Sequence, residues 1–144
     1  MSIIFSRQCE YAMQAVLYLA LKQENEMTSI KELTKKLSIP YHFLAKILQG
    51  LTRKGILISH KGPAGGFKLA SPAKEITMLQ IVEAIDGLSI LENCVFGFPN
   101  CSSDEPCAAH PEWEQIRDKI KNMLATKNIQ EMADITKKHQ YKKE

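Results

Sequence analysis

The stretch from residue 29 to residue 69 constrains the fold most, because two short helical patterns and a glycine-rich turn follow one another there. In its first part, SIKELTKKL, Ser29 precedes Glu32 by three residues, which is the signature of a capping box at a helix N-terminus. Three apolar side chains then follow at helical spacing. This part predicts a short amphipathic helix.

A second helix is predicted directly after a tight turn at residues 38–40. Pro40 suits the first turn of a new helix, and Gly55 is expected to end it. The apolar side chains between them recur at i, i+3, i+4 and i+7: Leu44, Ile47, Leu48 and Leu51. Two short helices joined by a tight turn predict a helix-turn-helix.

A β-hairpin is predicted after Gly55. The runs ILISHK and FKLAS have the composition of short strands, and the segment GPAGG between them permits a turn with positive φ. A helix-turn-helix followed at once by such a hairpin is the winged-helix arrangement. The fold class predicted is therefore mainly α with a small β-hairpin.

The charge distribution points to a polyanionic partner. Residues 29–68 contain eight basic residues and a single acidic one, whereas residues 92–114 contain five acidic residues and no Lys or Arg. A basic block of this density inside a foldable region is typical of nucleic-acid binding. The alternative is a solvated surface rich in lysine.

The rest of the chain divides around this unit. Helices are predicted over residues 6–22 and 76–85, and a coiled-coil-like seam begins at Trp113. We expect a winged helix-turn-helix domain at 1–90, a cysteine-rich sensor loop at 91–110, a dimerisation helix region at 111–135 and a flexible basic tail at 136–144.

The segment CVFGFPNCSSDEPCAAH, residues 94–110, carries three of the four cysteines. An irregular loop of this length is uncommon in a compact domain and tends to be functional. Its thiols could bind an iron-sulfur cluster or zinc, act as a metal-free redox switch, or be inert. Three thiolates do not complete a metal site, so a fourth ligand is required. Cys9, in the first predicted helix, is expected to be a core residue.

A cytoplasmic location is expected. The longest apolar run, residues 11–21, falls short of the roughly 20 residues that a membrane span requires. The N-terminal residues do not follow the order of a signal peptide. Clustered cysteines in a reducing compartment are more often metal ligands or redox centres than disulfides. A small thiol or metal enzyme is a competing hypothesis, but the chain lacks Cys-x-x-Cys, His-Glu-x-x-His and phosphate-binding glycine motifs.

Together these motifs resemble the IscR and NsrR type of bacterial winged-helix transcription regulators, the Rrf-two family. The resemblance rests on the first helix, on SIPYHFLAKILQGLTRKGIL leading into KGPAGGFKLA, on ITMLQIVEAIDG and on three cysteines before a long final helix. It implies a homodimer that reads a palindromic operator in double-stranded promoter DNA, and it implies no membrane partner.

The resemblance also implies DNA contacts for particular residues. Tyr41, His42 and Lys46 become groove-facing candidates, and the wing contacts become Lys61, Gly62, Gly65 and Gly66. We add Ser29 and Arg53 to this DNA-binding surface. Ala45 stands where an IscR-like protein has a glutamate, so the target sequence is expected to differ from the site that IscR reads.

For the cysteine loop, the resemblance implies an iron-sulfur cluster bound by Cys94, Cys101 and Cys107, which purification can remove. Two fourth ligands are open: His110, at the position of the histidine in IscR-like proteins, and Glu10, where NsrR-like proteins carry a carboxylate that reaches the cluster from the partner subunit. We favour His110 and a [2Fe-2S] cluster, with [4Fe-4S] as the alternative. The spacing Cys-x6-Cys-x5-Cys is one residue longer in its first gap than the family pattern. The function expected is a DNA-binding regulator whose operator affinity depends on this cluster or on redox state.

Overall fold

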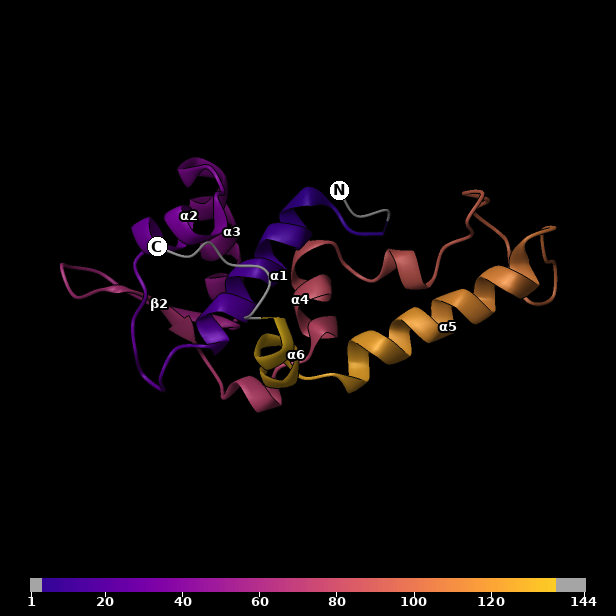
Figure 1. Ribbon diagram of the computed structural model, residues 1–144. Coiled ribbons are helices and arrows are strands. Elements are labelled where there is room, and N and C mark those ends of the chain that lie inside the picture. Colours follow the sequence, from indigo (N-terminus) through magenta and orange to yellow (C-terminus); the bar gives the residue numbers. More distant parts are fainter. Residues whose placement is uncertain (1–3, 137–144) are drawn as a thin grey trace.

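The computed structural model describes residues 4–136 and consists of helices with one two-stranded hairpin (Figure 1). The fold class predicted from the sequence is confirmed. The elements in chain order are α1 (Arg7–Ala20), α2 (Ile30–Leu37), α3 (Tyr41–Arg53), β1 (Leu57–His60), β2 (Gly66–Leu69), the 3-10 turn η1 (Ala73–Glu75), α4 (Met78–Ile85), the 3-10 turn η2 (Ser89–Leu91), α5 (His110–Thr126) and α6 (Ile129–Thr136).

The helix-turn-helix forms as the sequence pattern predicts. Ser29 caps α2 by accepting a hydrogen bond from the backbone N–H of Glu32, and Ser38 ends α2 in the left-handed conformation at φ 55°. The capping box itself is incomplete, because the Glu32 carboxylate lies 2.6 Å from Lys22 Nζ and accepts from the Tyr18 hydroxyl. Glu32 therefore ties α2 to the end of α1.

The wing is a short antiparallel hairpin that is anchored along the free edge of β2. Leu57 pairs with Leu69 and His60 with Gly66. Beyond the hairpin, Thr28 and Phe67 exchange two backbone hydrogen bonds of 2.8 and 2.9 Å. The loop that leads into α2 therefore acts as a third short strand beside β2, and the wing and the helix-turn-helix are held together.

The core surrounds α1, which is buried on most of its surface as its dense apolar pattern predicts. Small side chains on α1 let the other helices approach closely, and aliphatic side chains from those helices fill the space between. The fully buried side chains include Cys9, Ala12, Ala15 and Val16 of α1, Leu33 of α2, Leu44, Leu48 and Leu51 of α3, and Ile81 and Val82 of α4. This packing fixes α3, the second helix of the motif, from behind.

The helix α5 forms an arm that extends away from this core (Figure 1). The cysteine loop lies at the outer end of the arm, on the side of the molecule away from the wing. Toward its inner end, α5 reaches the core through the fully buried Leu124 and through Ile120, which packs against the core. The loop is thus joined to the winged helix by α4, η2 and α5.

The region 111–135, predicted to be a dimerisation helix region, is divided into two helices. The backbone leaves the helical conformation at Lys127 and Asn128, where Asn128 bridges to Thr77 and Ile129 N–H donates to Ile76. The following helix α6 buries Ile129 and Ala133 in the core. Exposed apolar side chains remain on both helices, at Ile116 and Met123 of α5 and at Ile135 of α6.

Of the tail predicted at 136–144, only Thr136 belongs to the described residues, as the last residue of α6. Within residues 4–136, no helix combines the length and the apolar character that crossing a membrane requires.

Candidate metal centre and nucleic-acid interface

The loop between η2 and α5 brings its three cysteines together. The sulfur atoms of Cys94, Cys101 and Cys107 all lie within 4.8 Å of one another, and all are free thiols. The closest pair is Cys94 and Cys107, whose sulfurs are 3.5 Å apart. The sequence places these thiols in one irregular loop, and the structure shows that the loop folds so that they converge.

His110 is the first residue of α5 and is 8% exposed. Its Nδ1 lies 3.4 Å from the Cys101 sulfur, and its Nε2 lies 3.6 Å from a carboxylate oxygen of Glu114. Among residues 4–136, Nε2 has no hydrogen-bond partner. A buried imidazole with one nitrogen against a thiol is well placed to become a metal ligand.

Glu10, the other fourth ligand considered, lies in the first turn of α1. Neither Glu10 nor His110 belongs to the group of ligand atoms that lie within 4.8 Å of one another, which consists of the three thiols, although His110 Nδ1 contacts one of them. A role for Glu10 therefore requires that a second copy of the chain bring it to the loop.

The environment of the loop changes the acidity of its thiols. Desolvation works against ionisation of Cys94, but the backbone N–H groups of Phe98 and Phe96 outweigh it, and the pKa of Cys94 is lowered to about 7. At Cys101, the backbone N–H of Cys107 favours the thiolate, yet burial and the two neighbouring thiols raise its pKa. Burial raises the pKa of the core thiol Cys9 to about 12.

This difference predicts site-selective alkylation of the metal-free protein. Because a lowered pKa means that the thiolate exists above about pH 7, the iodoacetamide labelling rate of Cys94 should rise between pH 6 and 8 and then level off. Cys101 should react only at higher pH, and Cys9 should stay unlabelled while the protein is folded. Peptide mass spectrometry after timed labelling measures each rate, and equal pH profiles for Cys94 and Cys101 would refute the expectation.

The donor set fits a metal centre. Two thiolates on one tetrahedral ion at about 2.3 Å are about 3.8 Å apart, and the Cys94 and Cys107 sulfurs are already close to that separation. The Cys101 sulfur and His110 Nδ1 form a second adjacent pair. Three thiols and one imidazole are a known ligand set for zinc, and thiolates with imidazoles also bind iron-sulfur clusters.

A groove runs between the helix-turn-helix and the wing. It is lined by all the predicted DNA-binding residues except His42 and Lys46: Ser29, Tyr41, Arg53, Lys61, Gly62, Gly65 and Gly66. Tyr41, at the start of α3, is 52% exposed, so its ring is available to a ligand in the groove. Basic side chains on two sides of a groove suit the backbone of a nucleic acid.

His42 and Lys46 are exposed on α3 outside this groove, one turn apart on the same face. Phe43, which the sequence analysis did not select, is 49% exposed and meets the Tyr11 ring edge-on, with 6.2 Å between ring centroids. An apolar residue that falls outside the buried stripe of α3 was the signal available in the sequence.

The wing glycines are required by close backbone contacts. A Cβ at Gly65 would overlap the His60 carbonyl, and one at Gly66, whose φ is +144°, would overlap the Thr28 carbonyl. Gly62 has a φ of +103° but open space around it. Gly65 and Gly66 are therefore required for the shape of the groove, independently of the predicted contacts with DNA.

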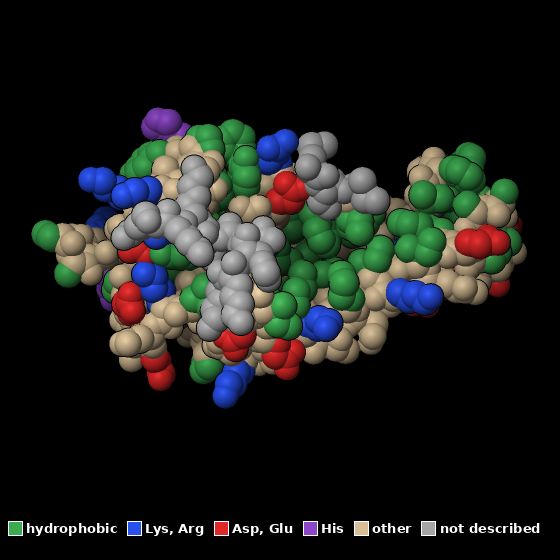
Figure 2. All heavy atoms as spheres, viewed as in Figure 1, with side chains coloured by type: hydrophobic (Ala, Val, Ile, Leu, Met, Phe, Trp, Pro, Cys, Tyr) green, Lys and Arg blue, Asp and Glu red, His purple; other side chains and the backbone are tan. Residues whose placement is uncertain are grey.

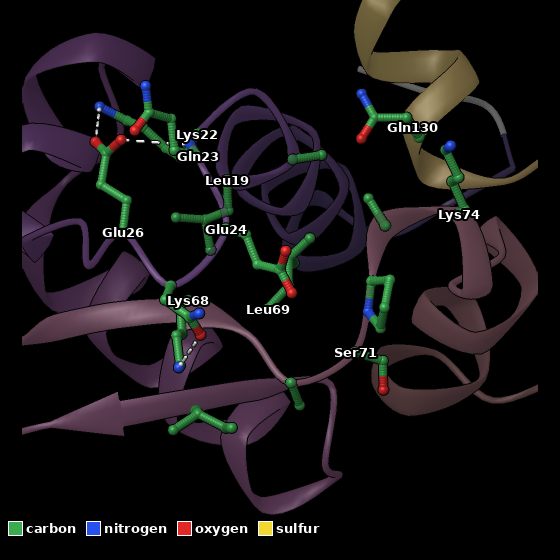
Figure 3. A pocket seen from close by; sticks show the side chains of 16 residues that line it. Leu19, Lys22, Gln23, Glu24, Glu26, Lys68, Leu69, Ser71, Lys74 and Gln130 are labelled. Carbon is green, nitrogen blue, oxygen red and sulfur yellow. Dashed lines mark hydrogen bonds and ion pairs between the residues drawn. The ribbon is translucent and has the colours of Figure 1, made fainter.

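A second hollow lies at the base of the wing, between the loop after α1, β2, η1 and α6 (Figure 3). Lys68 donates to the Asn25 side chain at 3.0 Å, and Lys22 pairs with Glu26 at 3.4 Å. The first contact joins the loop 21–28 to β2, and the second lies within that loop.

The fold and the groove define a winged-helix DNA-binding protein, and the loop adds a set of metal-ligating side chains. The chain belongs to the Rrf2 (Rrf-two) family, whose model, described as an iron-dependent transcriptional regulator, matches residues 5–135. It is a transcriptional regulator of that family.

Two relatives and two solved structures illustrate the match. A putative HTH-type transcriptional regulator of Aquifex aeolicus is 34% identical over 95% of this chain and 96% of its own length. The HTH-type transcriptional regulator IscR of Photorhabdus laumondii is 25% identical over 86% of this chain and 75% of its own length. The structure of CymR, the global cysteine regulator of B. subtilis, has a TM-score of 0.80 with 26% identity and covers 94% of this chain and 99% of its own. T. potens IscR, at 19% identity, shares the fold with a TM-score of 0.74 over 100% of this chain and 94% of its own.

Proposed function

We propose that this regulator binds a palindromic operator as a homodimer, and that a metal centre in the cysteine loop controls its affinity for DNA. The observation that carries the proposal is the convergence of three sulfur atoms within 4.8 Å in a loop joined to a winged helix. The relatives named above are transcriptional regulators, so we propose DNA binding in preference to the small thiol or metal enzyme considered from the sequence. A DNA-binding role also fits the expected cytoplasmic location.

We propose an iron-sulfur cluster, [2Fe-2S] in preference to [4Fe-4S], as the group bound. Each iron of a [2Fe-2S] cluster takes two protein ligands. The loop supplies two adjacent pairs, Cys94 with Cys107 and Cys101 with His110. When bound, the cluster would supply one-electron redox chemistry and sensitivity to oxidants.

Zinc and a metal-free thiol switch are the second candidates. The compact sulfur group also suits one tetrahedral ion. In a metal-free switch, a peroxide would oxidise the Cys94 thiolate, whose pKa is about 7, to a sulfenic acid, and the Cys107 thiol 3.5 Å away would then displace the hydroxyl as water to form a disulfide. Purification without air, followed by assays of iron, acid-labile sulfide and zinc, separates these candidates. Iron and sulfide in equal amounts support the cluster, and a colourless zinc protein would contradict it.

The fourth ligand is tested by His110→Ala beside Glu10→Ala. The imidazole Nδ1 lies 3.4 Å from the Cys101 sulfur, and this single contact favours His110, since neither His110 nor Glu10 belongs to the group of ligand atoms within 4.8 Å of one another. We therefore expect His110→Ala to shift the visible absorption and paramagnetic spectra and to weaken metal retention at least about 10-fold. Glu10→Ala should leave both near wild type. The opposite pattern would assign the fourth position to the partner subunit.

The dimer is proposed to form through the exposed face of α5. Ile116 and Met123 of the predicted seam are 47% and 40% exposed, while Leu124 is buried in the core of its own chain. Figure 2 shows hydrophobic side chains gathered at the outer end of the arm, where Val95, Phe96 and Phe98 are at least half exposed. An apolar surface of this kind is typical of an interface.

A contiguous path could carry the state of the loop to the recognition helix. Asp86, at the end of α4, accepts hydrogen bonds from both the backbone N–H and the hydroxyl of Ser6, the N-cap of α1. One turn further along α1, Tyr11 packs against Phe43 of α3. We propose that ordering of the loop biases the position of α1, and through it the position of α3.

A further inference from the structure

Two side chains of α5 reach back to the backbone just before the first cysteine of the loop. The indole Nε1–H of Trp113 donates to the Asn93 carbonyl at 2.8 Å, and Arg117 Nη1 donates to the same oxygen at 3.3 Å. Trp113 and Arg117 are four residues apart, so they project from one face of the helix. The peptide unit that leads into Cys94 is therefore held by two donors.

The same face of α5 also contacts the middle of the loop. His110, three residues before Trp113, places Nδ1 3.4 Å from the Cys101 sulfur. Trp113 also lines a hollow together with Cys94 and Val95. One helical face thus contacts the cysteine loop at its start, through Asn93, and near its middle, through Cys101.

We propose that Trp113 and Arg117 are positioning residues of the metal site, acting through the Asn93 carbonyl to hold Cys94 beside Cys107. This inference rests on the proposed metal-binding function. The loop between η2 and α5 contains no helix or strand, so ordering its thiols for a ligand costs conformational entropy. The two hydrogen bonds from Trp113 and Arg117 to the Asn93 carbonyl, here called the tether, order Cys94 in advance. The tether therefore lowers this entropic cost and slows release of the metal.

The tether also links the filling of the site to α5. Because the Asn93 carbonyl is adjacent to Cys94, a metal ion that immobilises Cys94 strengthens the hydrogen bonds from Trp113 and Arg117 to that carbonyl. By linkage, these hydrogen bonds strengthen metal binding by the same factor. The chain contains a single tryptophan. The indole N–H of the protein therefore reports on this one contact.

The test compares four full-length proteins reconstituted with iron and sulfide without air: wild type, Trp113→Phe, Arg117→Met and Gln115→Ala. Trp113→Phe keeps an aromatic ring and removes the donor, while Gln115→Ala changes an exposed neighbour on α5. Loss of visible absorption in excess EDTA should be at least about 10-fold faster in Trp113→Phe than in wild type. Arg117→Met should be intermediate, since its contact is longer, and Gln115→Ala should equal wild type.

Wild-type rates of loss in both Trp113→Phe and Arg117→Met would overturn the proposal. If Trp113→Phe does not fold, Arg117→Met decides, because it leaves the ring in place. The indole ¹H–¹⁵N signal of wild type should be protected from hydrogen exchange, and a freely exchanging signal would contradict the tether directly. Failure of wild type to take up iron would count against the proposed cluster and not against the tether. The tether would then be tested by loading the same four proteins with Zn²⁺ and measuring its loss to a competing chelator, with the same order of rates expected.

Discussion

Replacing Cys107 with serine is expected to reduce bound iron to below about one tenth of the wild-type amount, because an alkoxide or hydroxyl is a poor substitute for a soft thiolate ligand. Cys107 is central to the group. Its sulfur lies 3.5 Å from that of Cys94, and its backbone N–H donates to the sulfur of Cys101 at 3.4 Å. Iron and sulfide assays on protein purified without air provide the measurement.

Cys9→Ala is the matched control for this substitution. Cys9 is fully buried in the core and is not part of the thiol group in the loop. Its replacement should lower the free energy of unfolding by about 1–2 kcal/mol, through loss of packing, and leave the iron content unchanged. Full iron content in Cys107→Ser, or loss of iron in Cys9→Ala, would show that the metal is bound elsewhere.

Lys46→Glu should weaken operator binding about 100-fold, which corresponds to about 3 kcal/mol, because it removes a cation from the exposed face of α3 and places an anion near the DNA. His42 and Lys46 share that face, and Arg53 follows at the C-terminal end of the same helix, where it lines the groove. The slope of log affinity against log salt should also fall by about 1. Titration of a labelled operator at several salt concentrations measures both effects.

Lys121→Glu makes the same change in net charge on the exposed surface of α5, on the side of the helix away from Ile116 and Met123 and far from the groove. It is expected to change operator affinity by less than about 3-fold, since exposed charges beyond a Debye length are screened. If Lys46→Glu and Lys121→Glu weaken binding equally, only the net charge matters, and α3 is not the reading helix.

Local sequence patterns predict the winged helix well, because each of its elements is short and has its own signals. The apolar spacing after Pro40 matches the buried face of α3, and two glycines of the wing, Gly65 and Gly66, occupy backbone positions that exclude a side chain. The prediction of a capping box at Ser29 and Glu32 was wrong in part, because Ser29 caps the helix but the Glu32 carboxylate does not return to it. A long-range ion pair with Lys22 competes for its carboxylate, and local spacing contains no information about such a partner.

The division between α5 and α6 illustrates the same limit. A helical period continues past Leu124, but the pairing of Asn128 with Thr77 ends the helix, and that contact spans a long stretch of chain. Trp113 was assigned to an apolar seam because of its spacing. Its indole N–H instead bonds to Asn93, which hydrophobic periodicity cannot indicate. For the cysteine loop, the sequence shows which types of ligand are present. Only the fold shows that the three sulfurs converge, with those of Cys94 and Cys107 3.5 Å apart and that of Cys101 beside His110.

The central claim, that the state of the cysteine loop sets operator affinity, is tested most directly with one preparation of wild-type protein. Operator binding should be titrated without air before and after the metal is removed with a chelator, and again after reconstitution with iron and sulfide. The account predicts that affinity changes at least about 5-fold, equivalent to about 1 kcal/mol of coupling, and returns on reconstitution. Equal affinities in the metal-bound and metal-free protein would contradict it.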